Sequence, residues 1–225
     1  MKPGYQLITF DIYSALFDIE SSLLPIIESA LDSEIESLGF LRTWRQKQME
    51  YVLISNSLQR GRISFKAITR RALDYVLRRA SLELPQMKRE DLALAWDRLR
   101  PWPEAEAVVA EVKAKGYVIG ALSNGDEAML RALQAQISTA FDHFFASDQA
   151  GYYKPHPAIY ALPLKALDLS PDQVLHVAGS ANDTLGAKSA GLHCAWSNRF
   201  DDVVLDPKYG PDYEFKDLRG LLSVI

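Results

Sequence analysis

Four short segments of this sequence carry side chains that could together do covalent chemistry on a small molecule. They hold Asp11, the neighbouring pair Ser123 and Asn124, Lys154, and Asp183, and each follows a short apolar run. A carboxylate can attack an electrophilic centre and form a covalent ester, which divides one difficult reaction into two easier steps. A lysine beside it keeps the carboxylate ionised and neutralises developing charge. A second carboxylate can orient or deprotonate the water that opens the ester.

The apolar runs that precede these residues have the length and composition of buried strands. Predicted strands lie at residues 6–12, 117–122, 141–146, 174–178 and 193–196, and helical patterns between them lie at 104–115, 126–137, 157–167 and 184–190. Alternating strands and helices predict an α/β fold with a Rossmann-like parallel sheet and crossover helices. Because ligands in such sheets bind beyond the carboxyl ends of the strands, the chemical residues should gather at one edge.

Residues 19–98 interrupt this alternation, because they contain helical patterns and no convincing strand. The predicted helices lie at 22–38, 40–58, 64–80 and 88–98, and Ser64 is a candidate N-cap for the third. An all-helical block inserted after the first strand predicts a cap domain. We therefore expect a Rossmann-like core domain over 1–18 and 99–225 and an inserted all-helical cap domain over 19–98.

The bulk composition argues against several other classes of protein. A net charge of −4 over 225 residues gives no electrostatic reason to expect binding to nucleic acid or to a membrane. No apolar run approaches the roughly 20 residues that span a bilayer, and Met1–Gln6 lacks the apolar region of a signal peptide. The single cysteine, Cys194, cannot form an intramolecular disulfide. The sequence predicts a cytoplasmic protein that acts on a small molecule.

Taken in order, the four segments resemble the motifs of the haloacid-dehalogenase superfamily, which are an Asp, a Ser or Thr, a Lys and an acidic loop. Here they read Asp11-Ile12-Tyr13, Ser123-Asn124-Gly125, Lys154-Pro155 and Ala178–Asp183. The likeness covers essentially the whole chain, because the helical insertion also falls where that family places its cap. It implies that Asp11 is the nucleophile.

Most members of the superfamily are magnesium-dependent phosphatases, and this sequence departs from them at two points. Tyr13 stands where those enzymes usually carry a second Asp as general acid, and the acidic loop keeps only Asp183. With so few hard oxygen ligands, a magnesium site is poorly supported. The segment that begins at Asp11 is instead similar to that of the 2-haloacid dehalogenases, which displace halide from carbon without a metal. This resemblance implies no metal site and no cofactor.

A second likeness to the 2-haloacid dehalogenases lies in the predicted cap. The stretch Trp44-Arg45-Gln46-Lys47-Gln48-Met49-Glu50-Tyr51 is nearly identical to a segment whose arginine receives the departing halide in those enzymes. The resemblance implies that Arg45 and Asn124 form a halide cradle and that Tyr13, Met49 and Phe65 line an apolar pocket. It implies that Ser123 and Lys154 contact the substrate carboxylate and the nucleophile, with Tyr160 supporting that lysine. Asp183, with Lys154, would then hydrolyse the ester.

Two segments depart from the dehalogenase pattern. Those enzymes usually read Asp-x-Tyr-Gly-Thr, whereas this chain has Ser14-Ala15 in place of Gly-Thr. They commonly read Ser-Ser-Asn in the acidic loop, whereas this chain has Ala178-Gly179-Ser180. Ser14 and Ser180 are therefore candidates for contacts at the substrate site. Because the losses fall mainly on ester hydrolysis, the first half-reaction should be better preserved than the second.

Each candidate also has a purely structural interpretation. Asp11 and Asp183 could cap helices, Arg45 could be a solvated helix residue, and Tyr13, Met49 and Phe65 could simply pack in a core. None of the four histidines has partners at ligand spacing, so all are interpreted as structural: His143, His156, His176 and His193. Cys194 is also interpreted as structural.

The predicted function is hydrolytic dehalogenation of a small 2-haloalkanoic acid to the 2-hydroxy acid through an aspartyl ester, without a metal. The partners are then the halocarboxylate substrate and the halide product, and a homodimer is implied only by the resemblance. Two alternatives from other classes stay open: a small-molecule phosphatase, and a catalytically weak member that binds a small carboxylate. The same carbon chemistry on another leaving group is a further alternative.

Overall fold

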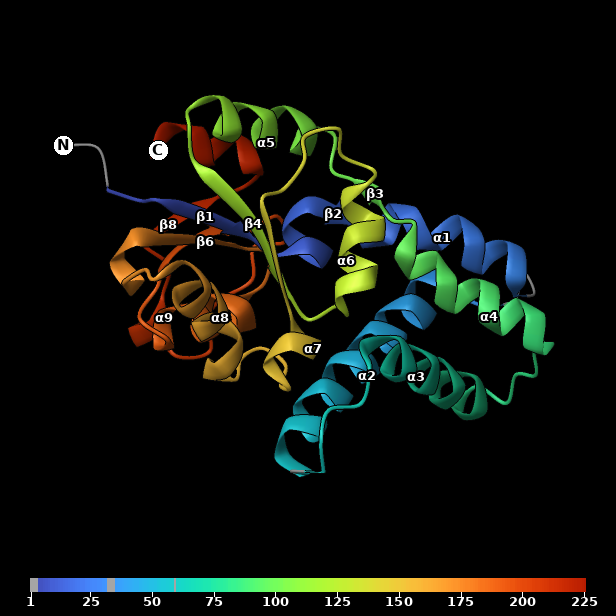
Figure 1. Ribbon diagram of the computed structural model, residues 1–225. Coiled ribbons are helices and arrows are strands. Elements are labelled where there is room, and N and C mark those ends of the chain that lie inside the picture. Colours follow the sequence, from blue (N-terminus) through green and yellow to red (C-terminus); the bar gives the residue numbers. More distant parts are fainter. Residues whose placement is uncertain (1–3, 32–34, 59) are drawn as a thin grey trace. The chain divides into compact units, whose positions relative to one another are not determined.

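The chain forms two separately packed units and passes between them twice. The computed structural model describes residues 4–31, 35–58 and 60–225 (Figure 1). The sheet unit comprises residues up to Phe17 and from Pro101 onward, and the helical unit comprises Asp18–Arg100. The crossings lie in β2 (Phe17–Asp18) and β3 (Arg100–Pro101), which pair with each other. Two predictions extend beyond the described residues. The helix predicted at 22–38 includes residues 32–34, and the segment predicted to lack a signal peptide includes the first three residues of the chain.

Six strands of the described chain form one parallel sheet, in the order β5-β4-β1-β6-β7-β8. Their bounds are β1 (Leu7–Phe10), β4 (Val118–Ser123), β5 (His143–Ala146), β6 (Val174–Ala178), β7 (His193–Ser197) and β8 (Tyr213–Phe215). In the centre, Phe10 of β1 lies opposite Ala121 of β4 on one side and Val177 of β6 on the other. The predicted α/β fold with a Rossmann-like parallel sheet is confirmed.

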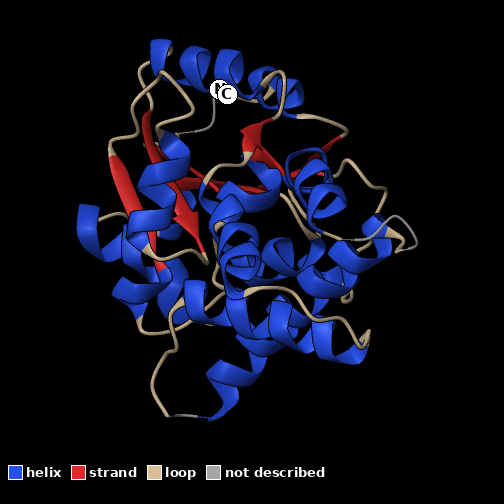
Figure 2. Ribbon diagram, turned by 90° about the vertical axis from the view of Figure 1, so that its right-hand side faces the viewer, coloured by secondary structure: helices blue, strands red, loops and turns tan. Residues whose placement is uncertain are grey.

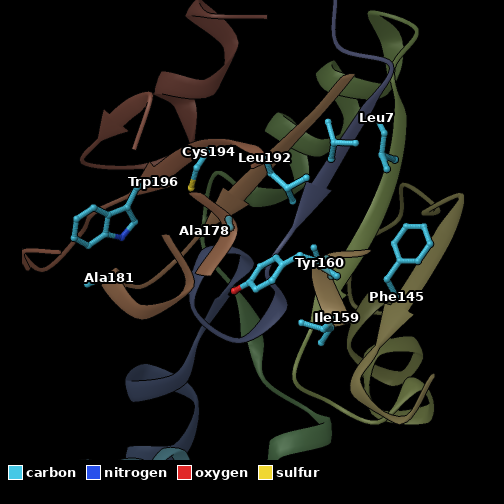
Figure 3. Packing of buried hydrophobic residues seen from close by; sticks show 12 residues of the cluster. Leu7, Phe145, Ile159, Tyr160, Ala178, Ala181, Leu192, Cys194 and Trp196 are labelled. Atoms are coloured by element: carbon cyan, nitrogen blue, oxygen red, sulfur yellow. The ribbon is translucent and has the colours of Figure 1, made fainter. Parts of the chain in front are cut away.

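The central strands are buried on both faces, which explains their uninterrupted apolar sequences. Every residue of β1 and of β6 is buried. Figure 1 shows α5 (Ala105–Ala114) on one side of the sheet, and α8 (Pro157–Leu167) and α9 (Ala181–Ser189) on the other. In the core cluster, Figure 3 shows Ile159 and Tyr160 from α8 together with Phe145 from β5 and Ala178 from β6. This core therefore reaches the edge of the sheet that carries the predicted chemical residues.

Short helical elements complete the sheet unit. They are η1 (Ile12–Leu16), α6 (Glu127–Gln134), α7 (Ser147–Ala150), η3 (Pro171–Gln173), η4 (Pro207–Tyr209) and η5 (Leu218–Ser223). Figure 2 shows that helices make up more of the described chain than strands do. Within the described residues, no helix combines the length and the apolar character that a bilayer crossing requires.

The last strand of the sheet, β8, is not predicted by the sequence patterns. It has three residues, none of them buried, and it pairs only with β7, where Ala195 lies opposite Tyr213. A segment this short offers too few positions for a recognisable alternation. Its strand conformation follows from the exposed edge that β7 presents.

The helical unit consists of α1 (Ile19–Ala30), α2 (Ser37–Leu58), α3 (Phe65–Arg79), α4 (Gln86–Leu94) and the turn η2 (Ala95–Asp97). Ser64 Oγ accepts the N–H of Ala67 at 3.2 Å, so its predicted role as the N-cap of α3 is confirmed. The prediction of one helix over 22–38 is wrong at its end, because α1 stops at Ala30 and α2 begins at Ser37. The Glu36 carboxylate accepts main-chain N–H groups of the first turn of α2, which stabilises its start there.

Candidate active site

Most of the predicted catalytic side chains lie beyond the carboxyl ends of neighbouring strands. Asp11 directly follows β1, and Ser123 is the last residue of β4, with Asn124 after it. Asp183 lies in the first turn of α9, which follows β6, and Lys154 lies in the loop between α7 and α8. Because β4, β1 and β6 are adjacent in the sheet, their ends bring side chains from distant parts of the sequence together.

Asp11 is buried, and both of its carboxylate oxygens accept hydrogen bonds. Oδ1 accepts from Ser123 Oγ at 3.0 Å and from Lys154 Nζ at 3.3 Å. Oδ2 accepts from the main-chain N–H of Ser14 at 3.2 Å and from its Oγ at 3.3 Å. Asp11 is also the N-cap of η1, a single π-helical turn of a kind that is frequent at functional sites. The capping contact and the site contacts together fix the orientation of this carboxylate.

Lys154 brings its ammonium group between the two buried carboxylates. Its Nζ lies 2.8 Å from Asp183 Oδ2 and 3.3 Å from Asp11 Oδ1, and its side chain is only 5% exposed. The main-chain N–H of Lys154 donates to Asn124 Oδ1 at 2.7 Å, which ties its loop to the end of β4. A buried ammonium group is stabilised only when it is paired. The lysine therefore holds together two carboxylates that would otherwise repel each other.

Asp183 accepts hydrogen bonds on both of its oxygens. Tyr160 Oη donates to Oδ1 at 2.8 Å, while Lys154 Nζ at 2.8 Å and His176 Nε2 at 2.9 Å contact Oδ2. Burial favours the neutral acid, but the charges and hydrogen bonds of Lys154 and His176 hold the pKa of Asp183 well below its usual range. Burial and the nearby Asp183 charge raise the pKa of Tyr160 well above its ordinary value, so the phenol remains a donor. The interpretation of Asp183 as a helix cap is wrong, because Ser180 caps α9.

His176, interpreted from the sequence as a structural histidine, lies in the structure beside the predicted catalytic residues. His176 is fully buried in the middle of β6, and its ring contacts Asp183, Lys154 and Thr9. No local spacing marks it, because its partners come from β1, from α9 and from the Lys154 loop. For the other histidines the structure gives packing and capping contacts: His143 stacks on Phe145, His156 caps α8, and His193 meets the edge of Tyr5.

Two of the predicted substrate contacts in the sheet unit differ in where their hydroxyl groups point. Ser14 donates to the Asp11 carboxylate, as described above, and is half-buried. Ser180 Oγ instead accepts the main-chain N–H of Asp183 at 3.3 Å as the cap of α9. Ser14 therefore contacts the group of buried side chains formed by Asp11, Lys154 and Asp183, the carboxylate cluster, through its hydrogen bond to Asp11. The Ser180 hydroxyl instead caps a helix.

Tyr13, predicted to line the pocket, is buried in η1. Its hydroxyl lies 3.9 Å from Met129 Sδ. A Cβ atom at Gly125 would come within 2.9 Å of that hydroxyl, so the glycine after Asn124 leaves room for the tyrosine ring. The Ser123-Asn124-Gly125 motif therefore supplies both polar side chains and the space for an aromatic neighbour.

The candidates from the helical unit lie along α2 and at the start of α3. Arg45 is half-buried, its Nη1 donates to Gln48 Oε1 at 2.5 Å, and its guanidinium carbon lies 5.5 Å from the centroid of the Trp96 ring. Met49 is half-buried on the same helix, and Phe65 is fully buried. Arg45 is therefore held by neighbours inside its own unit, and is not the freely solvated residue of the structural interpretation.

The donor set of the carboxylate cluster does not fit the magnesium ion of the related phosphatases. Magnesium binds through carboxylate and other oxygen ligands. Here the oxygens of Asp11 and Asp183 that face each other already contact the ammonium of Lys154, at 3.3 and 2.8 Å. Beside this pair, Tyr13 and the loop residues Ala178 to Ser180 supply no further carboxylate. In the part of the chain that the structure describes, no group of three or more His, Cys, Asp or Glu side chains is arranged to hold a metal ion.

Comparisons with known proteins agree with this fold. Residues 5–191 match the family of haloacid dehalogenase-like hydrolases. The (S)-2-haloacid dehalogenase of Pseudomonas sp. (strain YL) is 32% identical over 96% of this chain and 93% of its own length. The enzyme of the same name from Xanthobacter autotrophicus is 36% identical over 88% of this chain and 77% of its own length.

A solved structure of the L-2-haloacid dehalogenase from Xanthobacter autotrophicus, with chloropropionic acid covalently bound, superposes with a TM-score of 0.86. It is 29% identical to this chain and covers 96% of each chain. The family match spans far more than half of the sequence, and the relatives extend over nearly all of it. The chain belongs to the haloacid dehalogenase-like hydrolases.

Proposed function

We propose that this chain hydrolyses a small 2-haloalkanoic acid to the 2-hydroxy acid and releases halide, without a metal. The observation that carries this proposal is the environment of Asp11, a buried carboxylate whose two oxygens are held by Ser123, Lys154 and Ser14. Such a group is oriented for attack and is shielded from bulk water. The names of the relatives, which are 2-haloacid dehalogenases, support carbon–halogen bonds as its target.

In the first half-reaction, an oxygen of Asp11 bonds to Cα of the substrate while the bond from Cα to the halogen breaks. The halide leaves with the bonding electron pair, and an aspartyl ester remains. Asn124 uses its carbonyl oxygen to hold the Lys154 loop, so its NH₂ group is the part that can donate to the halide. We assign the second donor to the guanidinium of Arg45. Donors aimed at developing charge typically contribute roughly 10²–10³-fold in rate.

The remaining candidates shape the substrate pocket. In this proposal Tyr13, Met49 and Phe65 surround the apolar part of the haloacid. The hydroxyl of Ser123 and the ammonium of Lys154 hold the substrate carboxylate and the nucleophile. Ser180 stays close to the acidic loop through its cap of α9, and Tyr160 supports the lysine through its hydrogen bond to Asp183.

In the second half-reaction, a water oxygen bonds to the carboxyl carbon of Asp11 and the bond from this carbon to the ester oxygen breaks. One proton of the water ends on the hydroxyl of the product, and the other is released to solvent. Asp183 is a weak base, because three donors and a lowered pKa stabilise its charged form. Its role is to hold Lys154 beside the ester, where the ammonium stabilises the oxyanion that develops.

A halide-release assay tests the proposal. The purified chain is incubated with both enantiomers of 2-chloropropionate and 2-bromopropionate, with chloroacetate, and with p-nitrophenyl phosphate, each with and without EDTA. We expect halide and hydroxy acid from at least one haloacid, undiminished by the chelator. Phosphate release that requires magnesium would instead favour the phosphatase, and haloacid binding without turnover would favour the catalytically weak member.

The single cysteine is buried, and its burial raises the pKa of the Cys194 thiol, so it is an unreactive group compatible with a reducing compartment. We propose the cytoplasm as that compartment. The homodimer rests on the resemblance alone, and size-exclusion chromatography with light scattering tests it.

A further inference from the structure

His176 has no role in the proposed mechanism, yet it is fully buried among the polar groups of the site. It occupies the third position of the five-residue strand β6, with Thr9 of β1 opposite it on one side and Cys194 of β7 on the other. Its exposed fraction is 0%. A buried imidazole is costly unless its nitrogens are paired, and here both are: Nδ1 lies 2.9 Å from Thr9 Oγ1 and Nε2 lies 2.9 Å from Asp183 Oδ2.

These contacts determine where the ring carries its proton. Asp183 is a charged carboxylate and can only accept, since its pKa lies well below the usual range. Nε2 must therefore bear a hydrogen in order to donate to Oδ2. Thr9 Oγ1 can either donate or accept, so it satisfies Nδ1 whether the ring is neutral or charged. Nε2 and Lys154 Nζ lie 3.3 Å apart and then both donate to the same acceptor, Asp183 Oδ2.

Sharing that oxygen affects the lysine differently in the two half-reactions. Before the reaction, Lys154 Nζ contacts two carboxylates, Asp183 at 2.8 Å and Asp11 at 3.3 Å. Ester formation removes the negative charge of Asp11, so of the two protein carboxylates that contact the ammonium only Asp183 keeps its charge. The position of Asp183 is set by Tyr160 on one oxygen and by His176 on the other, which together fix the rotation of the carboxylate.

We propose that His176 is a positioning residue for ester hydrolysis: its Nε2–H holds Asp183, and through it Lys154, once Asp11 has been esterified. This inference rests on the proposed function for its kinetic consequence. For the protonation of Nε2 it rests on the hydrogen-bond geometry and on the charged state of Asp183. The two parts are therefore measured separately.

The kinetic test compares His176→Leu, which removes both ring contacts, with His176→Gln, whose side-chain amide can still donate toward Asp183. Halide release under single-turnover conditions follows ester formation, and intact mass spectrometry follows decay of the adduct. We expect His176→Leu to slow adduct decay by roughly 10²-fold, the typical cost of misplacing a catalytic group by about 1 Å. Ester formation should change by less than about threefold, and His176→Gln should recover much of the loss. His143→Gln, at the start of β5, is the matched control.

Because His176 lies in a central strand, His176→Leu could fail to fold, and circular dichroism checks this. Thr9→Val then serves as the second variant, since it keeps the β-branched shape and removes only the hydroxyl that meets Nδ1. It should slow adduct decay in the same direction. Two results would overturn the positioning role. One is equal slowing of both half-reactions. The other is wild-type kinetics in His176→Gln and Thr9→Val together with no loss in His176→Leu.

The geometric test needs no turnover. Nitrogen-15 NMR of the histidine side chains reports which ring nitrogen carries a proton. We expect a protonated Nε2 for His176, assigned by its disappearance in His176→Gln, and a shift of that signal in Asp183→Asn. An unprotonated Nε2 would refute the inference even in an active dehalogenase. Failure of the halide assay alone would refute the proposed function and leave this result standing.

Discussion

Ser14 fills the space that a side chain at position 179 would need. A Cβ atom built on Gly179 would collide with the main chain of Ser14 and Ala15 and would lie 2.7 Å from Ser14 Cβ. Because the shortest of these contacts involve main-chain atoms, glycine at position 179 leaves Ser14 in the position from which its hydroxyl donates to Asp11.

This packing predicts the effect of Gly179→Ala. The added methyl group meets main-chain atoms, so η1 must move and Ser14 must shift away from Asp11. We expect the free energy of unfolding to fall by about 1–3 kcal/mol, together with a loss of halide release. Urea unfolding and the halide assay measure the two effects. Gly4→Ala, whose Cβ would have no atom within 4 Å, is the control. Wild-type stability and activity in Gly179→Ala would mean that these loops separate easily.

The assignment of Arg45 predicts a loss that is confined to halide release. Arg45→Ala should reduce the rate by roughly 10²-fold or more, because a positive donor is lost where charge develops. Arg42→Ala is the matched control on the same helix, since Arg42 is exposed and pairs with Glu20. Circular dichroism checks that both variants fold. Near-normal turnover of Arg45→Ala would place the halide elsewhere.

Isotope labelling tests whether Asp11 attacks carbon. In a single turnover in ¹⁸O-water, the product hydroxyl should carry an unlabelled oxygen from the Asp11 carboxylate, and the label should remain on Asp11. Mass spectrometry of the hydroxy acid and of the peptide that contains Asp11 gives both results. Label in the product of the first turnover would show that water attacks the substrate directly, and the ester mechanism would be wrong.

The lowered pKa of Asp183 predicts a component of acid unfolding. Because its folded pKa lies below the unfolded value of about 4, the charged form contributes stability that is fully present above about pH 4. That stability is lost as the pH falls through the folded pKa, at up to about 1.4 kcal/mol per pH unit for one group. Urea unfolding between pH 7 and pH 3 should show a smaller acid loss in Asp183→Asn than in the wild type. Asp91→Asn, an exposed position on α4, should behave like the wild type.

Local patterns in the sequence were enough to predict the parallel sheet and to place Asp11 and Ser123 at the carboxyl ends of its strands. Buried parallel strands are continuous apolar runs, and their carboxyl ends meet at one edge of the sheet. A polar residue that follows such a run, as Asp11 and Ser123 do, can therefore be placed before any contact is known. The same reasoning predicted the Ser64 cap, which depends only on its neighbours along the chain.

The tertiary structure alone decided which of the buried polar residues touch. Thr9 and His176 are 167 positions apart, and each looks in the sequence like an isolated polar residue within a strand. Only the register of β1 against β6 sets them opposite each other, and only the first turn of α9 brings Asp183 to the same ring. The close packing of Gly179 against Ser14 was equally hidden, since a missing Cβ has meaning only once the facing loop is in place. Hydrogen bonds and close packing act between atoms in space, whereas sequence patterns record neighbours along the chain.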